Sequence, residues 1–527
     1  MTIDQAPVLL TDEEIQRFIC DGFLILKPNV DSSVHTLIDE RFNWLVENEP
    51  NAGNNILPRL PELNQILNCA VVRGAMISLL GEDYLIHPHR YWHSRPPEKE
   101  TMSETQIRDE IKRGSHQDAY TPAAQGKSHC LQFLRFMYYS HDMELANGPT
   151  HVVPGSQYHS SLTDEDRDRQ IPVLGNAGTI FISHFDLAHA GCPNMSGRCR
   201  NMIKFLFLRA KPSPIPSWNH QDSSWKKPSN LQAPYNLENC WKKQWDLLCQ
   251  NIKDTHDPSD ATALISDLAK ESELKSRISL IQKIGHSQSE SAVEPLAALL
   301  NTAHQAERTT AIYALAEIGE AAIPALIKIL EAAEQGLDKS VYNSTISLND
   351  ACYALSAIGE SALDAVLPLL KVKKWWSLVN AIHVVNDCAV YRDDIRQALE
   401  DLLGNEKSFV VSFSINALGA IRSIKSSGKL FNILEGPRET VQTGDVKEWP
   451  EQWFHHYTIA LAMARMGKEL TEFEARIIPQ LDHEFGQAAI MFTETLKRIG
   501  TPTALQAIVD DLSNRRWDAV LSEKRNF

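Results

Sequence analysis

A histidine and an aspartate two residues apart, in the stretch GSHQDAY at residues 114–120, have the types and spacing of two metal ligands. In a β-strand, residues i and i+2 point to the same face, so the imidazole of His116 and the carboxylate of Asp118 would approach one point. Two such residues and a distant histidine form the two-histidine, one-carboxylate set that binds ferrous iron and leaves coordination positions open. His189 lies 73 residues after His116 (189 − 116), closely follows the apolar segment GTIFISH, and is the candidate third ligand.

The same H-x-D spacing occurs at two other places, and context separates them from the first. His184 and Asp186 lie in ISHFDLAH, and His220 and Asp222 lie in WNHQDSS. The first of these pairs has Met195, and no arginine, 11 residues after its histidine (195 − 184), and the second lies in a segment rich in Pro and Trp. We expect surface or packing roles for both pairs.

An arginine beyond the third candidate ligand would complete a site for a dicarboxylate co-substrate. Such a molecule, for example 2-oxoglutarate, chelates iron at one end and needs a cation for its far carboxylate. Arg200 lies 11 residues after His189 (200 − 189) and begins the next apolar segment, so a hairpin would return it to the metal. The planar guanidinium binds a carboxylate through two parallel hydrogen bonds, which makes Arg200 the candidate anchor.

Length and composition limit the class of protein. A chain of 527 residues predicts two to four domains, and its net charge of −15 argues against a general nucleic-acid binder. The nine cysteines form no C-x-x-C pair, which predicts reduced thiols and a cytoplasmic protein. We find neither a basic, then apolar leader nor an apolar run of about 18 residues, so we expect no signal peptide and no membrane span.

The first half of the chain combines helices with short apolar strands. Thr11 begins the capping-box pattern TDEE, and a helical stripe follows that ends near Gly22. Helical patterns continue at 32–47 and 62–80, and from about residue 84 onward short apolar segments such as HCLQFLRFMYY and NMIKFLFLRAK dominate. Helices followed by many short strands predict an α+β domain built around a β-barrel or jelly roll.

The second half repeats itself. AIYALAEIGEAAIPALIKIL at 311–330 and ACYALSAIGESALDAVLPLL at 351–370 lie 40 residues apart (351 − 311) and match at most apolar positions. Each unit is an apolar helix, a turn with a glycine such as Gly319 or Gly359, and a second apolar helix. This pattern predicts a HEAT-type all-α solenoid of about six or seven units over residues 255–515.

Four ordered motifs in the first half resemble those of the phytanoyl-CoA dioxygenase-like iron(II)/2-oxoglutarate oxygenases. They are LTDEEIQRFICDGFLIL, SHQD, ANGPTHVVPGSQYH, and the H-x4-N-x5-R pattern that runs from His189 through Asn194 to Arg200. The resemblance spans residues 8–212 and implies a double-stranded β-helix core of the jelly-roll or cupin-like type. It also implies that the iron ligands are His116, Asp118 and His189.

The resemblance further implies how the co-substrate is bound and what reaction follows. Arg200 would bind 2-oxoglutarate, and Arg95 lies where the family often has a lysine that reaches the co-substrate. Iron, 2-oxoglutarate and O2 would give succinate, carbon dioxide and an oxidant that attacks an unactivated C–H bond. Because Asp118 occupies the position that related halogenases leave to halide, we expect hydroxylation. Many family members have a hydroxyl residue where Gly191 stands, so contacts to the co-substrate would differ in detail.

We therefore expect an oxygenase domain at 8–212, a connector at 213–254 and a HEAT-like solenoid at 255–515. The substrate would be a small metabolite or a peptide-linked group. The solenoid would recruit a protein or carrier-protein partner, since solenoids present long concave surfaces, or would serve as a scaffold for the barrel. The competing interpretation is an interaction adaptor with a non-catalytic barrel, and the intact ligand set argues against it.

The charged stretch at 95–114, directly before the first metal-ligand candidate, has two interpretations. It is either a solvated loop with at least one helical turn, or a lid over the site. In a lid, Arg108, Lys112 or Arg113 would contact an anionic substrate.

Overall fold

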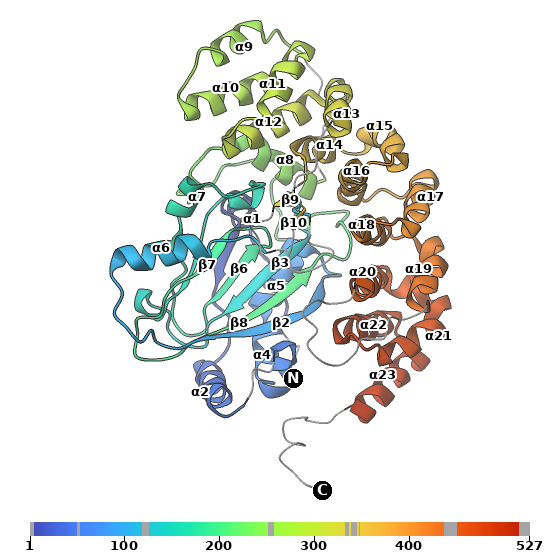
Figure 1. Ribbon diagram of the computed structural model, residues 1–527. Helices are drawn as coiled ribbons and strands as arrows, with labels where there is room; N and C mark the ends of the chain where they lie inside the picture. The colour runs from blue at the N-terminus through green and yellow to red at the C-terminus, as the bar shows by residue number, and fades with distance from the viewer. Residues whose placement is uncertain are drawn as a thin grey trace.

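The computed structural model describes residues 5–49, 53–118, 126–250, 258–332, 337–338, 345–346, 348–436 and 451–515. Figure 1 shows two parts: an N-terminal part built on β-sheets, and a helical solenoid that curves along one side of it. In the described residues, the predicted fold class is confirmed: an α+β jelly-roll domain is followed by an α-solenoid.

The N-terminal segment of the chain is mainly helical and contains five α-helices among the described residues. They are α1 (Asp12–Asp21), α2 (Ser32–Asn48), α3 (Ile56–Arg59), α4 (Leu63–Leu67) and α5 (Ala70–Leu80). The predicted capping box is present, because the Thr11 side chain accepts from the Glu14 backbone N–H and Glu14 bonds back to the Thr11 N–H. Gly22 ends α1 with a φ of 81°, a left-handed conformation that costs glycine little.

Two antiparallel sheets form the core of this domain. A five-stranded sheet has the order β1-β6-β3-β8-β2, and a three-stranded sheet has the order β5-β4-β7. The strands are β1 (Phe23–Leu26), β2 (Leu85–Arg95), β3 (Phe133–Tyr138), β4 (Thr150–Val152), β5 (Ile171–Pro172), β6 (Ile180–His184), β7 (His189–Gly191) and β8 (Arg200–Leu208). Met137, Phe181 and Met202 from the larger sheet and Val152 from the smaller one belong to one buried cluster, so the two sheets face each other.

The strand register decides which side chains point toward the smaller sheet. Directly opposite residues of an antiparallel pair share a face. Arg95 of β2 lies opposite Arg200 of β8, and Lys204 of β8 lies opposite Met137 of β3. Arg135 of β3 lies two residues from Met137, so these charged side chains share the face that Met137 presents to the smaller sheet. The other face carries Trp92, which stacks on Phe42 of α2 at a centroid distance of 5.0 Å.

The connector wraps around α1 before it enters the solenoid. It contains α8 (Glu238–Leu248). The carboxylate of Asp12 accepts hydrogen bonds from Trp218 Nε1 at 2.6 Å and from the backbone N–H of Gln221 at 2.9 Å. Asp21, at the other end of α1, accepts from the backbone N–H of Gln232 at 2.9 Å. The connector is therefore an ordered strap in the described residues.

The solenoid consists of paired helices. They are α9 (Thr262–Leu268), α10 (Leu274–His286), α11 (Val293–Leu299), α12 (Gln305–Ile318), α13 (Ile323–Ala332), α14 (Asp350–Ile358), α15 (Leu363–Val366), α16 (Trp375–Cys388), α17 (Asp393–Asp401), α18 (Ser408–Ala420), α19 (Ser427–Leu434), α20 (Glu451–Met466), α21 (Glu474–Ile477), α22 (Gly486–Ile499) and α23 (Pro502–Arg515). The even-numbered helices from α12 to α22 form the inner row, nearer the sheets (Figure 1). A short ladder of β9 (Leu337–Asp338) and β10 (Thr345–Ile346) interrupts the helical pattern.

One helical stretch of the solenoid has the composition of a membrane span. Among the described residues, Gln305–Ala332 is long and apolar enough by itself, and the bent pair Asp350–Ile358 and Glu360–Lys371 passes only if taken together. In the first stretch, 61% of the apolar window is buried inside the protein. Its apolar residues therefore pack in the solenoid core, because each helical repeat buries its apolar face against the neighbouring repeats.

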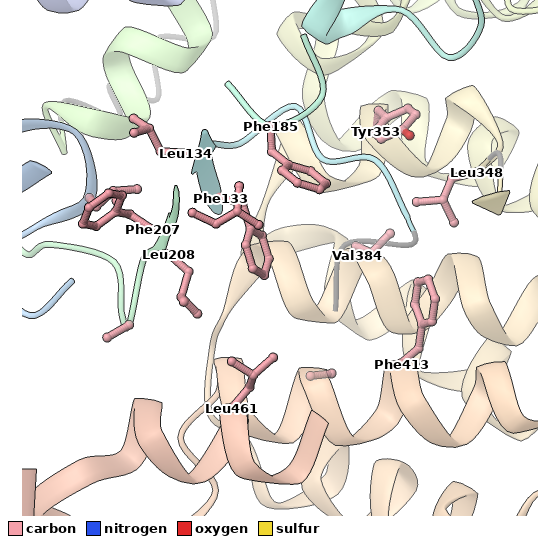
Figure 2. Packing of buried hydrophobic residues seen from close by; sticks show 14 of the residues in the cluster. Phe133, Leu134, Phe185, Phe207, Leu208, Leu348, Tyr353, Val384, Phe413 and Leu461 are labelled. Carbon is pink, nitrogen blue, oxygen red and sulfur yellow. The ribbon is translucent and has the colours of Figure 1, made fainter. Parts of the chain in front are cut away.

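The two parts share one hydrophobic core. Figure 2 shows Phe133 and Phe185 of the sheet domain near Val384, Phe413 and Leu461 of the solenoid. All five are buried and belong to one continuous cluster. An apolar interface of this kind fixes the relative position of two domains.

Candidate metal centre

The three candidate ligands converge. One ligand atom from each of His116, Asp118 and His189 lies within 4.8 Å of the other two, and no other such group of three occurs among the described residues. The distance is 3.4 Å from His116 Nε2 to Asp118 Oδ1 and 3.7 Å from His189 Nε2 to Asp118 Oδ2. Two imidazole nitrogens and one carboxylate oxygen form the donor set of a facial triad, which suits ferrous iron.

Backbone pairing brings the two histidines together. His116 and His189 form an antiparallel bridge, with the His116 N–H donating to the His189 carbonyl at 3.0 Å and the reverse bond at 2.9 Å. Their ring centroids lie 4.5 Å apart. The sequence predicted a strand at His116 and Asp118; in the structure this single bridge takes its place. The bridge suffices to align both rings with one centre.

Hydrogen bonds to backbone carbonyls orient both rings. His116 Nδ1 lies 2.7 Å from the Gly114 carbonyl oxygen, and His189 Nδ1 lies 3.4 Å from that of Leu187. Because a carbonyl only accepts, Nδ1 carries the proton in each ring. The Nε2 atoms are then the ones that face Asp118, as metal ligation requires.

Two buried cations keep Asp118, the carboxylate among the candidate ligands, ionised. Arg135 donates to Asp118 Oδ2 from Nη2 at 2.7 Å and from Nε at 3.1 Å, and Lys204 Nζ lies 3.9 Å from the same oxygen. Burial raises the pKa of the Asp118 carboxyl, but Lys204, Arg135 and His189 outweigh burial and leave it well below its ordinary value. Asp118 is therefore a carboxylate at neutral pH.

Arg135 also ties this carboxylate to the loop before the second histidine. Its side chain is fully buried and donates from Nη2 to the Phe185 carbonyl at 2.7 Å and from Nη1 to the Ser183 hydroxyl at 3.2 Å. Sequence analysis did not identify Arg135 or Lys204. The available signal was a cation within each of two largely apolar strands, Arg135 in FLRFMY and Lys204 in RNMIKFLFL.

Arg200 begins the next strand, as predicted, but the predicted hairpin is not formed, because β7 and β8 belong to different sheets. It begins β8, opposite Arg95, and its side chain is buried. No carboxylate of the described residues lies within ion-pair distance of Arg200, and its Nε has no hydrogen-bond partner there. Burial lowers the pKa of Arg200, and repulsion from Arg95 adds to this effect, although Tyr139 opposes it. A buried guanidinium without a counter-charge is costly, so this position fits an anionic ligand.

Arg95 has a partner of its own. Its Nη2 donates to Glu98 Oε1 at 2.9 Å, and its backbone carbonyl accepts from Asn194 Nδ2 at 2.9 Å. A Cβ added at Gly191 would lie 3.7 Å from Arg95 Nη1, so the glycine is beside this guanidinium. Arg95 therefore lies opposite Arg200 and beside Gly191, while Asn194 holds the loop after the third candidate ligand.

The other two H-x-D pairs do not join the metal centre. His184 and Asp186 are both buried where the sheet domain meets the solenoid, with Asp186 Oδ2 accepting from the Ser128 N–H at 3.1 Å. His220 in the connector bonds to Asp12 through Nδ1 at 2.9 Å. Both pairs have packing roles, in agreement with the sequence.

The charged stretch before the first histidine forms helix α6 (Glu104–Gly114), which covers β7. Ile107 and Ile111 pack against Ala190 and Cys192. Of the cations predicted to contact a substrate, Lys112 pairs with Asp168, Arg113 pairs with Glu110 at 2.7 Å, and Arg108 is exposed. Residues Glu104–Gly114 of the predicted stretch 95–114 thus form a helix packed on β7, residues 96–103 form no helix, and the three cations pair with other side chains or are exposed.

A jelly-roll core that presents two histidines and one aspartate at a single point is typical of iron-dependent oxygenase domains. In agreement, residues 31–202 match the family described as phytanoyl-CoA dioxygenase (PhyH), and residues 261–342 match HEAT repeats. The chain therefore carries a PhyH domain followed by HEAT repeats, in the order that the motifs predicted. The family match supports an oxygenase-type enzyme.

Some solved structures also resemble part of the chain. The non-heme alpha ketoglutarate dependent carbocyclase SnoK from nogalamycin biosynthesis is 14% identical, with a TM-score of 0.31, over 39% of this chain and 88% of that chain. EctD from S. alaskensis with 2-oxoglutarate and 5-hydroxyectoine is 16% identical, with a TM-score of 0.32, over 44% of this chain and 88% of that chain. No curated protein matches the chain.

Proposed function

We propose that this protein is an iron(II)/2-oxoglutarate-dependent dioxygenase that hydroxylates an unactivated C–H bond of a small metabolite or peptide-linked substrate. The observation that carries the proposal is the convergence of His116, Asp118 and His189 in a domain that also buries Arg200 without a counter-charge, on the strand whose Lys204 pairs with Asp118. One feature fits a divalent cation, and the other fits the far carboxylate of 2-oxoglutarate. An adaptor with a non-catalytic barrel would need neither.

The donor set fits ferrous iron. Both histidines present Nε2, and Asp118 is ionised by its cationic neighbours. When bound, iron with 2-oxoglutarate and O2 supplies the oxidation of the C–H bond. The protein's residues hold the ligands in place and leave one side open, since the side chain of His116 is 40% exposed whereas that of Asp118 is only 7% exposed.

Arg200 would anchor the far carboxylate of 2-oxoglutarate. A guanidinium binds a carboxylate through two parallel hydrogen bonds, and burial strengthens such a pair. Arg95, opposite Arg200 on the neighbouring strand, would contribute a second positive charge while it keeps its ion pair with Glu98. Asp118 occupies the carboxylate position of the ligand set, so we propose hydroxylation as the outcome.

The solenoid would act first as a scaffold, because it shares a hydrophobic core with the sheet domain. Its remaining surface would be free to bind a protein or carrier-protein partner that delivers the substrate. All nine cysteines are free thiols, which supports the proposal of a reducing, cytoplasmic location.

An anaerobic titration tests the proposed site. Adding ferrous iron and 2-oxoglutarate to the apo-protein is expected to produce the weak visible charge-transfer band of the chelate. The band should vanish in His116→Ala and Asp118→Ala, and Arg200→Gln should require a much higher 2-oxoglutarate concentration. Wild-type protein that gives no band under metal-replete conditions would refute the proposal.

A further inference from the structure

The residue between the first two candidate ligands, Gln117, is buried and held on all sides. Its Nε2 donates to the carbonyls of Asp186 at 2.8 Å, Ser156 at 3.1 Å and His159 at 3.2 Å. Its Oε1 accepts from Lys127 Nζ at 2.6 Å. The position of Gln117, and with it of the ligands on either side, therefore depends on Lys127 and on the turn at 156–160.

The solenoid holds the first of these two supports. Lys127 Nζ also donates to the Ser160 carbonyl at 2.5 Å, which links the lysine to the turn. The Lys127 carbonyl in turn accepts from the hydroxyl of Tyr353, on α14, at 3.2 Å. The Tyr353 ring stacks on the ring of His129, two residues after Lys127, at a centroid distance of 4.1 Å. Lys127, His129 and Tyr353 are all buried.

Helix α12 of the solenoid holds the second support. Arg308 Nη2 donates to the Ser160 hydroxyl at 2.7 Å, and that hydroxyl donates to Gln305 Oε1 at 3.2 Å. One residue further along α12, Thr309 Oγ1 donates to the Tyr158 carbonyl at 3.2 Å. Lys127 and the 156–160 turn, which both hydrogen-bond to Gln117, are thus bonded directly to solenoid helices.

Contacts of this kind matter for a metal site because outer partners fix the orientation of the ligands. Loss of such a partner typically weakens metal affinity about 10–100-fold. A buried polar network also has few satisfied arrangements, so removal of one member displaces the others. The contacts from α12 and α14 can therefore fix the orientation of the candidate ligands in the segment His116–Asp118.

We propose that the HEAT solenoid is a positioning element of the metal centre, acting through Tyr353 and Thr309 on Lys127 and the 156–160 turn, and through these on Gln117. The inference rests on the proposed iron site and adds a role for the solenoid in it. In the simpler alternative, the same contacts only stabilise the domain interface. Metal affinity separates the two, because a purely structural contact would change stability alone.

The experiment uses full-length protein with cobalt(II), whose visible bands report ligand geometry, and then iron(II) with 2-oxoglutarate. Gln117→Leu removes the central amide, and the double variant Tyr353→Phe/Thr309→Val removes two solenoid hydroxyls with little change of shape. Tyr457→Phe is the matched control, because this buried hydroxyl of α20 bonds to His87 of β2, away from Gln117. Melting temperatures of the metal-free proteins monitor folding.

We expect a cobalt dissociation constant raised about 10–100-fold in Gln117→Leu and about 3–10-fold in the double variant, with altered bands in both. Tyr457→Phe should lower the melting temperature without changing the constant. Equal constants in wild type and double variant, or an equal loss in the control, would overturn the inference. A wild type that binds cobalt but forms no 2-oxoglutarate chelate would refute the proposed function alone, and one that binds no cobalt would overturn both.

Discussion

At the scale of single residues, the metal centre depends on a buried ion pair that the ligand motif does not contain. Arg135 contacts Asp118 with two nitrogens, so its removal frees the carboxylate to rotate. We expect Arg135→Leu to raise the iron dissociation constant about 10–100-fold in anaerobic titrations, with Arg135→Lys in between. Arg209→Leu is the control, because this arginine bonds to carbonyls elsewhere in the domain, including that of Leu131 at 3.0 Å. Equal constants for Arg135→Leu and wild type would contradict this role.

A second residue-scale prediction concerns pH. Burial raises the pKa of Asp186 to about 7. The pKa of an aspartate in an unfolded chain is about 3.9. When the folded state raises this pKa, the protonated acid stabilises the fold, and the stabilisation is complete below about pH 3.9. It is lost as the pH rises through the pKa of the folded state. We expect the melting temperature of Asp186→Asn to fall less than that of wild type between about pH 5.5 and about pH 8. Asp222→Asn should behave like wild type, since Lys226 and Ser224 hold that pKa low. Parallel curves for wild type and Asp186→Asn would contradict the assignment.

Much of the candidate site could be predicted from the sequence, because its ligands lie at fixed spacings. His189 and Arg200 begin consecutive strands, β7 and β8, and both were found from this short spacing, although the two strands belong to different sheets and form no hairpin. Arg135 and Lys204 could not be assigned in the same way, because their contact with Asp118 depends on how three strands pair. Gln117 was visible in the motif, but its partners come from distant segments.

At the scale of elements, helix α6 is seated on the strand that carries the third candidate ligand. Ile111 is buried against Ala190 and Cys192, and the helix ends at Gly114, whose carbonyl orients His116. We expect Ile111→Ala to cost about 2–5 kcal/mol of local packing and to speed amide hydrogen exchange across Glu104–Gly114. Ile215→Ala should have no such effect, since Ile215 is 68% exposed. Unchanged exchange in Ile111→Ala would show that α6 is held by other contacts.

The elements themselves were largely predictable, since each has a local signal. The capping box gave the start of α1, short apolar segments gave β3, β6 and β8, and the repeated glycines Gly319 and Gly359 have positive φ angles of 77° and 94°. The helical stretch predicted at 62–80 is divided into α4 and α5 at Asn68 and Cys69. The β9–β10 ladder was not predicted, because two-residue strands carry no periodic pattern.

At the scale of the whole molecule, the sheet domain and the solenoid are parts of one folded unit. Phe133 and Phe185 pack on the solenoid, and His129 bonds to Tyr313 at 3.0 Å. We expect a fragment that ends at residue 254 to aggregate and to show no cooperative thermal unfolding, because it exposes this apolar face. A fragment that melts cooperatively and binds iron like the full chain would support a recruiting role for an independent solenoid.

The arrangement of the two parts was not predictable from the sequence, since it depends on contacts between residues far apart in the chain. His129 and Tyr313, for example, are 184 positions apart (313 − 129).

The central claim is that this chain uses iron and 2-oxoglutarate as an oxygenase, and release of carbon dioxide from 2-oxoglutarate labelled at its first carbon tests it most directly. Many such enzymes would turn over slowly without substrate, so the assay does not require the substrate to be known. We predict release that depends on both iron and O2, is abolished in Asp118→Ala and is strongly reduced in Arg200→Gln. Well-folded, iron-loaded wild-type protein that releases no more carbon dioxide than Asp118→Ala would contradict the account.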